Sequence, residues 1–401
     1  MKNRENTASD SSRRENPVKN LLLRHRSRAI RRLRSGIDWP FAILVMVLVC
    51  IGTTFVFSSS YAYAKHNYGD SYFFIRKQIG WVLCAIVIIY LVARFGDYLI
   101  LKRFSVPIFL VSYLLLWCVF FFGEDANGAK RWIFVGPISV QPSEIVKFSV
   151  ILLISSYLVW LETKGRDLIR TVRYGILPFV ALVLLIGFPL YKQPHLSAMI
   201  IIFALIYILM YLGGVKSAIL GSGIGIGGAA MVALMLFTSH GQKRIQAWLH
   251  PELDPTGDSW QPLQSLNAIG SGGLWGVGLG QSKQKHLYLP EPQNDYIFAI
   301  ICEEMGFVFA VLIIALFVLL IWRGFLIARN APSKFSSLLV MGIMVQVGVQ
   351  VFLNIGVVTG ALPATGVALP FFSYGGSSLL ILMAEMGVVL NVSRYSYSEK
   401  T

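Results

Sequence analysis

The apolar residues of this chain gather into runs about as long as a membrane-spanning helix. Residues 40–57, 198–212 and 308–322 contain no charged side chain. About 20 apolar residues in a helix cross the hydrocarbon core of a bilayer, which is roughly 30 Å thick. The pattern of such runs predicts ten transmembrane helices. Their approximate bounds are residues 38–58, 76–93, 105–122, 143–160, 175–191, 195–212, 217–238, 295–321, 337–359 and 374–392.

The composition agrees with this pattern. Of the 401 residues, 55% are hydrophobic and only 14% are charged, whereas a soluble protein carries about 25% charged residues. A soluble helical bundle is therefore disfavoured, and we expect an all-α polytopic membrane protein. The first apolar run follows a long polar tail without a small-residue cleavage site, so we expect a retained helix rather than a signal peptide.

The basic residues predict the orientation of the chain. Residues 1–37 hold eleven Lys and Arg residues, and positively charged flanks stay in the cytoplasm. Ten spans, within a membrane domain at 38–392, then return the tail at 393–401 to the cytoplasm as well. The net charge of +15 thus largely reflects topology. Residues 24–34 (RHRSRAIRRLR) favour contact with anionic headgroups over nucleic-acid binding, because no nucleic-acid-binding fold accompanies them.

Two outer segments, residues 123–142 and 239–294, are longer than the topology requires, and long loops are often functional. Two glycine-rich stretches match nucleotide-binding loops only in part. Residues 221–228 contain G-x-G-x-x-G but lie in an apolar run, so close helix packing is the better interpretation. Residues 270–280 lack the Gly-Lys-Ser/Thr ending of a P-loop. They are predicted as flexible turns, with anion binding by backbone amides as the alternative.

Ionisable residues occur where the fourth span begins. Ser143 is a candidate N-cap, because its hydroxyl can accept a bond from a free helix amide. Glu144 and Lys147 share one helix face and are expected to pair. Charges within a span usually face the protein interior or a wet cavity and mark function. A purely structural ion pair remains an equal alternative.

Three carboxylates accompany the eighth span, in LPEPQNDYIFAIICEEMG at residues 289–306. Asn294 or Asp295 could simply cap the helix. Alternatively, Asp295 is an acid placed at the outer membrane surface for chemistry. Glu303 lies about 12 Å deeper along a helix. At least one of Glu303 and Glu304 is expected to line a polar interior, because a carboxylate facing lipid is costly.

Basic side chains on the outer side could bind an anionic, lipid-linked substrate. Arg131 is the best placed for a diphosphate, because its guanidinium binds such groups with two parallel hydrogen bonds. The other candidates are Lys130, Lys243, Arg244, Lys283 and Lys285. Residues 361–378 (ALPATGVALPFFSYGGSS) break the last apolar region with prolines and glycines. Such backbone is tolerated at membrane depth only where protein buries it or water reaches it, which favours a cavity-lining turn over a plain loop.

These motifs together resemble the SEDS family (shape, elongation, division and sporulation). The resemblance rests on QPSEIVK (141–147), on DPTGDSWQPLQSLNAIGSGGLWGVGLGQSKQK (254–285), on 289–306 and on LPATGVALPFFSYGGSS (362–378). It covers essentially all ten spans. The sequence LPEPQNDYIFAI and the long basic tail are more similar to those of the division and sporulation branch than to those of the rod-elongation branch.

The resemblance implies a function. SEDS proteins are peptidoglycan glycosyltransferases that polymerise lipid II, an undecaprenyl-diphosphate-linked disaccharide pentapeptide, on the outer face of the bacterial cytoplasmic membrane. They act with a class B penicillin-binding transpeptidase and with other division or elongation proteins. Nothing implies a nucleic-acid partner.

The resemblance also assigns residues. The essential acid of the family falls on Asp295, its ion pair on Glu144 and Lys147, and its G-A-x-R-W element on residues 128–132. Ser373, Gly375 and Gly376 of the last motif are expected to support the site. The chain departs from the family at the start of the sixth span, where Pro-Asp-Leu-Gly is common and this chain has Pro-His-Leu-Ser (194–197). His195 brings no negative charge to that position.

The implied chemistry is the attack of a sugar hydroxyl on a lipid-linked sugar. Asp295 is the candidate general base. Lys130, Arg131, Lys243 and Arg244 are the candidates that stabilise the departing diphosphate, with Glu303 and Glu304 supporting from deeper positions. A divalent cation (Mg²⁺ or Mn²⁺) could share this role through substrate phosphates, and no organic cofactor is expected. A lipid II flippase and a scaffold that only recruits the transpeptidase are the alternatives.

Overall fold

A computed structural model describes residues 36–126, 129–136, 138–215, 221, 228 and 236–395 of the protein. Within these ranges, nine helical segments are long and apolar enough to cross a membrane. They are α2 (Trp39–Tyr68), α3 (Phe73–Phe95), α5 (Ser105–Phe122), α6 (Pro142–Lys164), α7 with α8 (Val172–Gly175, Leu177–Lys192), α9 (Leu196–Gly213), α13 (Ile297–Arg329), α14 (Lys334–Val358) and α15 (Gly376–Ser393). Nine of the ten predicted spans are thereby confirmed.

Four further predictions, about the seventh span, the two tails and the glycines at 221–228, fall on residues that the structure does not describe or describes only in part. The seventh predicted span, 217–238, lies almost entirely outside the described residues, as do the basic tail at 1–35 and the end of the chain at 396–401. The proposed glycine packing at 221–228 is likewise not described. The fold class itself, a helical multi-pass membrane protein, stands on the nine described spans.

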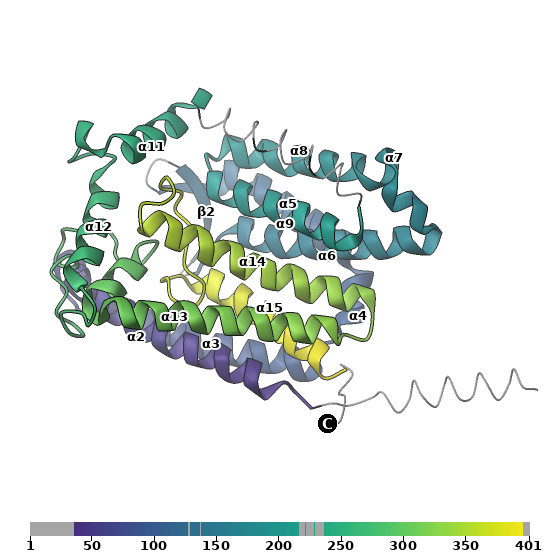
Figure 1. Ribbon diagram of the computed structural model, residues 1–401, viewed down its shortest axis with the longest axis horizontal. Coiled ribbons are helices and arrows are strands. Elements are labelled where there is room, and N and C mark those ends of the chain that lie inside the picture. The colour runs from purple at the N-terminus through teal and green to yellow at the C-terminus, as the bar shows by residue number, and fades with distance from the viewer. Residues whose placement is uncertain are drawn as a thin grey trace, which may run out of the picture.

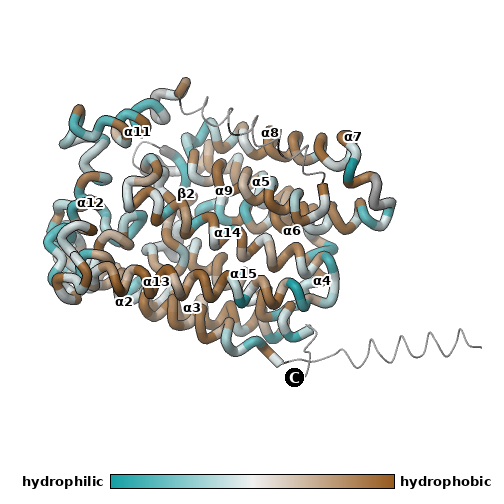
Figure 2. Tube along the Cα trace, in the orientation of Figure 1, coloured by the Kyte–Doolittle hydropathy of each residue, from teal (hydrophilic) through white to brown (hydrophobic). Residues whose placement is uncertain are grey.

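The helices form one bundle whose long axes run in broadly the same direction (Figure 1). The C-terminal helix α15 packs against α3, α14 and α13, while α6 contacts α5, α9 and α14. Apolar residues dominate the helices and polar residues gather at α11 and α12, beyond one end of the bundle (Figure 2). Short helices complete the structure. They are α4 (Tyr98–Arg103), η1 (Arg166–Arg170), α11 (Ser239–Leu249), η2 (Pro251–Leu253) and α12 (Trp260–Gly272).

A small antiparallel sheet adds to the predicted helical fold. It fills the outer segment between α5 and α6, with strands β1 (Gly123–Ala126), β2 (Ala129–Val135) and β3 (Ile138–Val140) in sequence order. Ile133 of β2 pairs with Val140 of β3 and with Gly123 of β1. The sequence analysis did not predict this sheet, because three short strands give little alternation to detect. Its central strand carries Arg131 and Trp132.

The end of the bundle at which α2 begins is fixed by ion pairs. The guanidinium of Arg323 on α13 donates two hydrogen bonds to Asp38, the N-cap of α2, at 3.0 and 2.8 Å. Lys334 at the start of α14 pairs with Glu162 of α6 at 3.1 Å. A two-point guanidinium–carboxylate contact is both strong and directional. It therefore fixes the start of α2 against the C-terminal part of α13.

Helix α13 is interrupted at Gly306, where the backbone has φ 77° and ψ −178°. The preceding segment, residues 273–278, lies against this break. Its amides at Val277 and Gly278 donate to the carbonyls of Glu303 and Glu304, both at 2.9 Å. In return, its carbonyls at residues 273 and 274 accept from the amides of residues 307 and 308, at 2.9 and 3.2 Å. Two carbonyls and two amides at the break therefore have partners, as a low-dielectric environment requires.

This contact revises the interpretation of residues 270–280. They were expected to be flexible turns or an anion-binding cradle, yet the amides of Val277 and Gly278 are already used by α13 and that of Gly276 donates to the carbonyl of Gly272 at 2.8 Å. The glycines serve the backbone conformation instead. Gly276 and Gly278 have φ angles of 79° and 107°, which residues with a side chain rarely adopt.

Gly306→Ala is predicted to destabilise the protein. A Cβ at residue 306 would lie 2.3 Å from the amide nitrogen of Gly276, and the positive φ angle alone costs an L-residue roughly 1–3 kcal/mol. Gly80→Ala on α3 is the matched control, because a Cβ there meets nothing within 4 Å and alanine is the better helix former. Thermal unfolding in detergent should show a lower melting temperature for the first variant only, and equal melting temperatures would refute this account of the break.

Candidate active site

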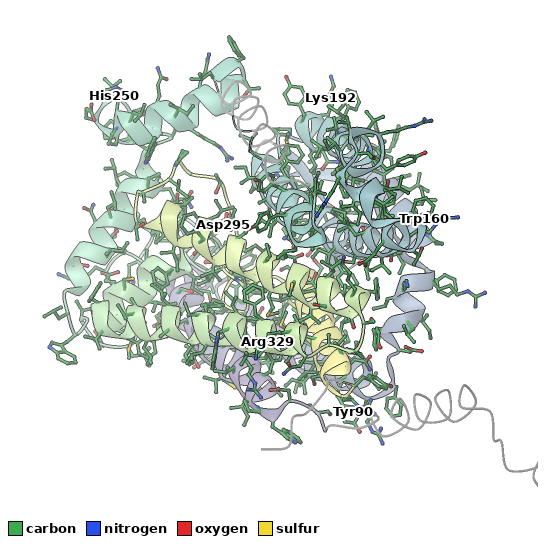
Figure 3. The ribbon with its side chains drawn as sticks, turned by 45° about the vertical axis from the view of Figure 1, so that its right-hand side comes forward. Tyr90, Trp160, Lys192, His250, Asp295 and Arg329 are labelled. Carbon is green, nitrogen blue, oxygen red and sulfur yellow. The ribbon has the colours of Figure 1, made fainter. Side chains whose placement is uncertain are left out.

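A cavity of about 620 Å³ opens among the helices near Tyr68, the last residue of α2. Its walls come from α3, the small sheet, α6, α9, α14, α15 and the segments at 291–295 and 366–376. Figure 3 places Asp295 inside the bundle, whereas Tyr90 and Trp160 lie at its margin. The interrupted region at 361–378 therefore contributes a wall of the cavity, as the sequence predicted, and is not a plain loop.

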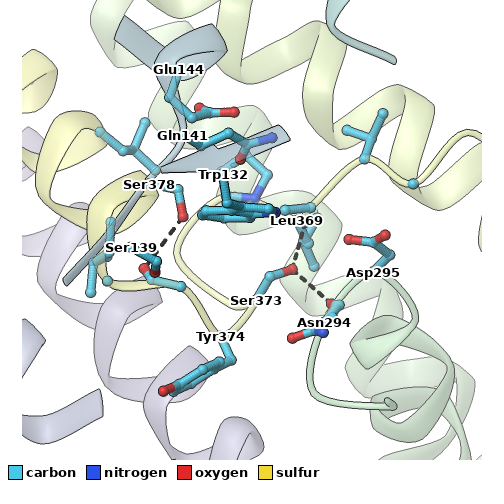
Figure 4. A pocket seen from close by; sticks show the side chains of 18 of the residues that line it. Trp132, Ser139, Gln141, Glu144, Asn294, Asp295, Leu369, Ser373, Tyr374 and Ser378 are labelled. Carbon is cyan, nitrogen blue, oxygen red and sulfur yellow. Dashed lines mark hydrogen bonds between the residues drawn. The ribbon is translucent and has the colours of Figure 1, made fainter. Parts of the chain in front are cut away.

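The backbone of Asp295 is held by hydrogen bonds from two directions. The side-chain amide of Asn354 on α14 donates to the carbonyl of Asp295 and to that of Val367, both at 2.7 Å. The hydroxyl of Ser373 donates to the carbonyl of Asn294 at 2.8 Å and accepts from the amide of Leu369 at 2.8 Å (Figure 4). Two segments without regular structure are thereby fixed to each other and to α14.

The carboxylate of Asp295 is left without a hydrogen-bond donor among the described residues. Gly366, with a φ of 71°, lies beside it, and a Cβ at that glycine would come within 3.2 Å of Oδ2. Burial raises the pKa of Asp295 to about 6, while Arg131 and Arg244 act in the opposite direction and Glu291 raises it further. A carboxylate in these surroundings is a stronger base than an exposed one.

Asp295 does not cap α13. The helix begins at Ile297, its N-cap is Tyr296, and no side chain caps it. The capping alternative is therefore wrong for both Asn294 and Asp295. The Asn294 side chain instead donates to Glu291 at 2.9 Å.

Of the four predicted diphosphate-binding cations, the structure brings two near Asp295. Arg131 lines the cavity and donates from Nη2 to the carbonyl of Pro194 at 2.9 Å. Arg244 lies close enough to act on the pKa of Asp295, and donates to the carbonyl of Ala364 at 3.0 Å. Lys130 and Lys243 are exposed and do not line the cavity, so the expectation that they contact the same site is not supported.

Glu144 and Lys147 form the predicted ion pair at 2.8 Å, and both line the cavity. Lys147 is almost completely buried, so its partner is needed to offset the cost of removing the charge from water. The predicted N-cap at Ser143 is wrong. Helix α6 starts at Pro142, its N-cap is Gln141, and no side chain caps it.

Glu303 and Glu304 are buried but do not line the cavity. Glu304 pairs with the ammonium of Lys285 at 2.8 Å and accepts from Ser58 of α2 at 2.6 Å. Glu303 accepts from the hydroxyl of Ser282 and from the amide of Lys283. The prediction that they support the reaction from below is therefore replaced by a structural role, which is to fix residues 282–285 on α13.

The three predicted residues of the last motif all line the cavity. Ser373 orients the neighbouring backbone, as described above. Gly376 starts α15 against the indole of Trp81, and a Cβ there would come within 2.3 Å of the ring. Gly375 directly precedes it at the cavity wall. Gly376 thus allows α3 and α15 to approach closely at the cavity wall.

The sequence analysis missed several polar residues of the cavity and its floor. The carboxylate of Glu385 on α15 is buried and accepts from the side-chain amide of Gln346 on α14 at 2.9 and 3.1 Å. Gln346 lines the cavity, as does Trp132, whose indole lies between Gln141 and Ser373 in Figure 4. Glu385 was detectable, because a single acid within an apolar run is rare and usually marks function. Asn354 and Gln346 gave no comparable signal.

Comparison with known proteins agrees with the geometry. A family model described as "Cell cycle protein", covering FtsW, RodA and SpoVE, matches residues 38–398. Stage V sporulation protein E of Bacillus subtilis is 38% identical over 364 residues, covering 90% of this chain and 97% of that protein. The probable peptidoglycan glycosyltransferase FtsW of Trichlorobacter lovleyi is 38% identical over 360 residues, covering 89% and 93%.

Solved structures show the same architecture. The crystal structure of the rod shape determining protein RodA of Thermus thermophilus aligns with a TM-score of 0.67 and 27% identity, covering 90% of this chain and 98% of that chain. A chain from a structure of a peptidoglycan synthase complex, which concerns the coordination of polymerization and crosslinking, aligns with a TM-score of 0.72 and 28% identity, covering 89% and 98%. The chain thus belongs to the SEDS family, in the division and sporulation branch of these peptidoglycan glycosyltransferases.

Proposed function

We propose that this glycosyltransferase polymerises lipid II into glycan strands at the outer face of the bacterial cytoplasmic membrane, with Asp295 as the general base. The proposal rests chiefly on one observation. In a cavity within a membrane bundle, the Asp295 carboxylate is fixed through its backbone, has no donor among the described residues, and faces cations. A group that is positioned but unpaired is free to accept a proton from substrate.

The proposed orientation rests on α2 and on the basic tail. The basic tail precedes Trp39, and Tyr68 at the other end of α2 lines the cavity. A helix of 30 residues extends about 45 Å, so the tail and the cavity lie on opposite sides of the bilayer. With the tail in the cytoplasm, the cavity opens to the outside, where lipid-linked sugars would enter from the outer leaflet. Both termini are then cytoplasmic.

The reaction needs one proton transfer and one displacement. The 4-hydroxyl of the acceptor GlcNAc attacks the anomeric carbon of the donor MurNAc, and its proton passes to the Asp295 carboxylate. The new glycosidic bond forms as the bond to the diphosphate oxygen breaks, and undecaprenyl diphosphate leaves with the electron pair. Arg131 stabilises the charge that gathers on this leaving group, and Arg244 contributes to the positive field around Asp295.

A divalent cation fits this site only as a partner of the substrate. Among the described residues there is no group of three or more side chains that could hold a metal ion, and the Glu144 carboxylate is already paired with Lys147. The diphosphate oxygens would be its main ligands, which is typical of Mg²⁺ at phosphate sites, and Asp295 would remain the base. Such an ion would neutralise charge on the leaving group.

The partner is proposed to be a class B penicillin-binding transpeptidase, within the machinery of division or sporulation. The similarity to a chain of a peptidoglycan synthase complex supports this assignment, as does the similarity to a sporulation protein and to FtsW. A polymerase on the outer face produces strands where a transpeptidase can crosslink them.

Asp295→Asn is predicted to abolish synthesis without loss of stability. A positioned base contributes about 10²–10⁴-fold, and lipid II polymerisation by purified protein with its transpeptidase in detergent should fall by that factor. The melting temperature above pH 6 should equal or exceed that of wild type, because Asn carries no desolvated charge. Asp254→Asn, at an exposed position of the outer segment, is the matched control and should leave the rate unchanged.

Two outcomes would count against this assignment. Near-normal glycan synthesis by Asp295→Asn would exclude Asp295 as the base. Wild-type protein that makes no polymer in detergent, yet moves lipid II across vesicle membranes, would identify a flippase instead.

The pH dependence of polymerisation should report Asp295. Burial raises its pKa to about 6, and only the ionised carboxylate accepts a proton, so kcat/KM should fall as the pH drops through about 6. Arg131 lowers this pKa, so Arg131→Gln should move the acidic limb to higher pH. Radiolabelled glycan product measured across the pH range tests both statements. A flat profile around pH 6 would contradict them.

A further inference from the structure

The N-terminus of α9 presents free hydrogen-bond donors to the cavity. The helix has 18 residues, its N-cap is His195, and no side chain caps it. Among the described residues, no acceptor is found for the backbone amides of Leu196, Ser197 and Ala198. Ser197 and Ala198 are cavity-lining positions. The start of a helix carries partial positive charge and favours anions.

Buried side chains at the same place also lack partners. His195 is 6% exposed and Ser197 3% exposed, and both line the cavity. Neither His195 Nδ1 nor Ser197 Oγ has a hydrogen-bond partner among the described residues. A buried polar atom without a partner costs about 1–3 kcal/mol, and a ligand that accepted hydrogen bonds from these two atoms would remove that cost.

Arg131 is fixed beside this helix start. Its Nη2 donates to the carbonyl of Pro194, the residue before His195, and its buried Nε has no described partner. A guanidinium held in this way has remaining donors for an anion. Lys147, whose ammonium is paired with Glu144, contributes further positive charge on the same side of the cavity.

His195 is a neutral donor in these surroundings. Burial lowers its pKa well below the usual value, and the nearby cations Arg131, Lys147 and Arg244 lower it further. The side-chain amide nitrogen of Gln141 lies 3.5 Å from Nε2. With the Gln141 amide in this orientation its N–H donates, which assigns the acceptor role to Nε2 and the ring proton to Nδ1. The unpartnered atom is therefore an N–H group.

We propose that the start of α9, with His195, Ser197 and Arg131, binds the diphosphate of the lipid-linked donor. The site offers several donors: the backbone amides of Ser197 and Ala198, the imidazole N–H, the Ser197 hydroxyl and the Arg131 guanidinium. Diphosphate oxygens are acceptors that carry negative charge, which matches this set. Asp295 lines the same cavity, so base and leaving group would face each other across the reacting sugars.

The proposal rests on the proposed function and extends it to residues that depart from the family pattern. An aspartate at residue 195 would place a negative charge at the start of α9 and repel a diphosphate. A neutral histidine supplies a donor instead. Ser197 adds a hydroxyl that can donate to the same anion.

The test compares two substitutions of His195, by Asn and by Asp, which have the same shape as each other but differ in charge. The full chain is used, together with its transpeptidase. His195→Asn keeps an N–H close to the position of Nδ1, whereas His195→Asp replaces it with a charged acceptor. His195→Asp should weaken the binding of inorganic pyrophosphate, measured by calorimetry, by about ten- to a hundredfold, as expected for a lost bond to a charged group. His195→Asn should remain within about threefold of wild type.

A second pair of variants guards against a folding effect. Ser197→Ala should weaken pyrophosphate binding by about three- to tenfold. Ser155→Ala is its matched control, because Ser155 on α6 is equally buried and unpartnered but does not line the cavity. It should bind as wild type does. If His195→Asp fails to fold, the serine pair alone decides the question. Equal binding by both serine variants would then overturn the proposal.

Pyrophosphate and undecaprenyl diphosphate distinguish the headgroup from the lipid tail. Loss of affinity for both in His195→Asp supports a diphosphate site at α9. Unchanged affinity for inorganic pyrophosphate overturns the proposal, whether or not the affinity for undecaprenyl diphosphate changes. The KM for lipid II should rise more than kcat falls. Pyrophosphate binding is measured without turnover. Absence of glycan synthesis by wild type would therefore reject the proposed function, and the binding data would still test the diphosphate site.

Discussion

The side-chain amide of Asn354 is the contact on which the geometry of the cavity depends. It joins the carbonyl of Asp295, just before α13, to the carbonyl of Val367, in the segment between α14 and α15. Neither segment has regular hydrogen bonding of its own at this point. A donor group on α14 thus holds two walls together, and the hydroxyl of Ser373 joins the same two segments at the neighbouring residues. The Asp295 carboxylate owes its position to backbone contacts and remains free for chemistry.

The structure separates structural charges from those available to a substrate. Glu304 with Lys285, and Arg323 with Asp38, are mutually satisfied and lie outside the cavity. Arg131 and the start of α9 are incompletely satisfied and line it. A buried polar group without a partner is costly, so the unpaired donors that line the cavity are available to a ligand, whereas the paired charges outside it are not.

Much of the fold could be predicted from the sequence, because length and hydropathy alone define a transmembrane helix. The nine described spans appear in the predicted order, and the i, i+3 spacing was enough to predict the Glu144–Lys147 pair. Arg131 and Asp295 were assigned from local motifs and do line one cavity.

The errors arose where the partner of a residue is distant in sequence. The carboxylates of Glu303 and Glu304 bind residues some twenty positions earlier and, for Glu304, Ser58 of α2. Periodicity contains no information about such contacts. Ser143 has the right residue type for a cap, but Gln141 occupies the N-cap position. The small sheet and the contact of residues 273–278 with α13 depend on backbone pairing, which side-chain patterns do not encode.

The interruption of α13 at Gly306 also bears on how the chain is made. Residues 273–278, which complete the backbone hydrogen bonds at the interruption, precede it by about thirty positions. A ribosome therefore delivers the complementary segment before the helix that needs it. The helix can enter the membrane with its partner already synthesised, so the exposed amides and carbonyls need not persist in lipid. Biosynthetic order and local geometry are matched at this position.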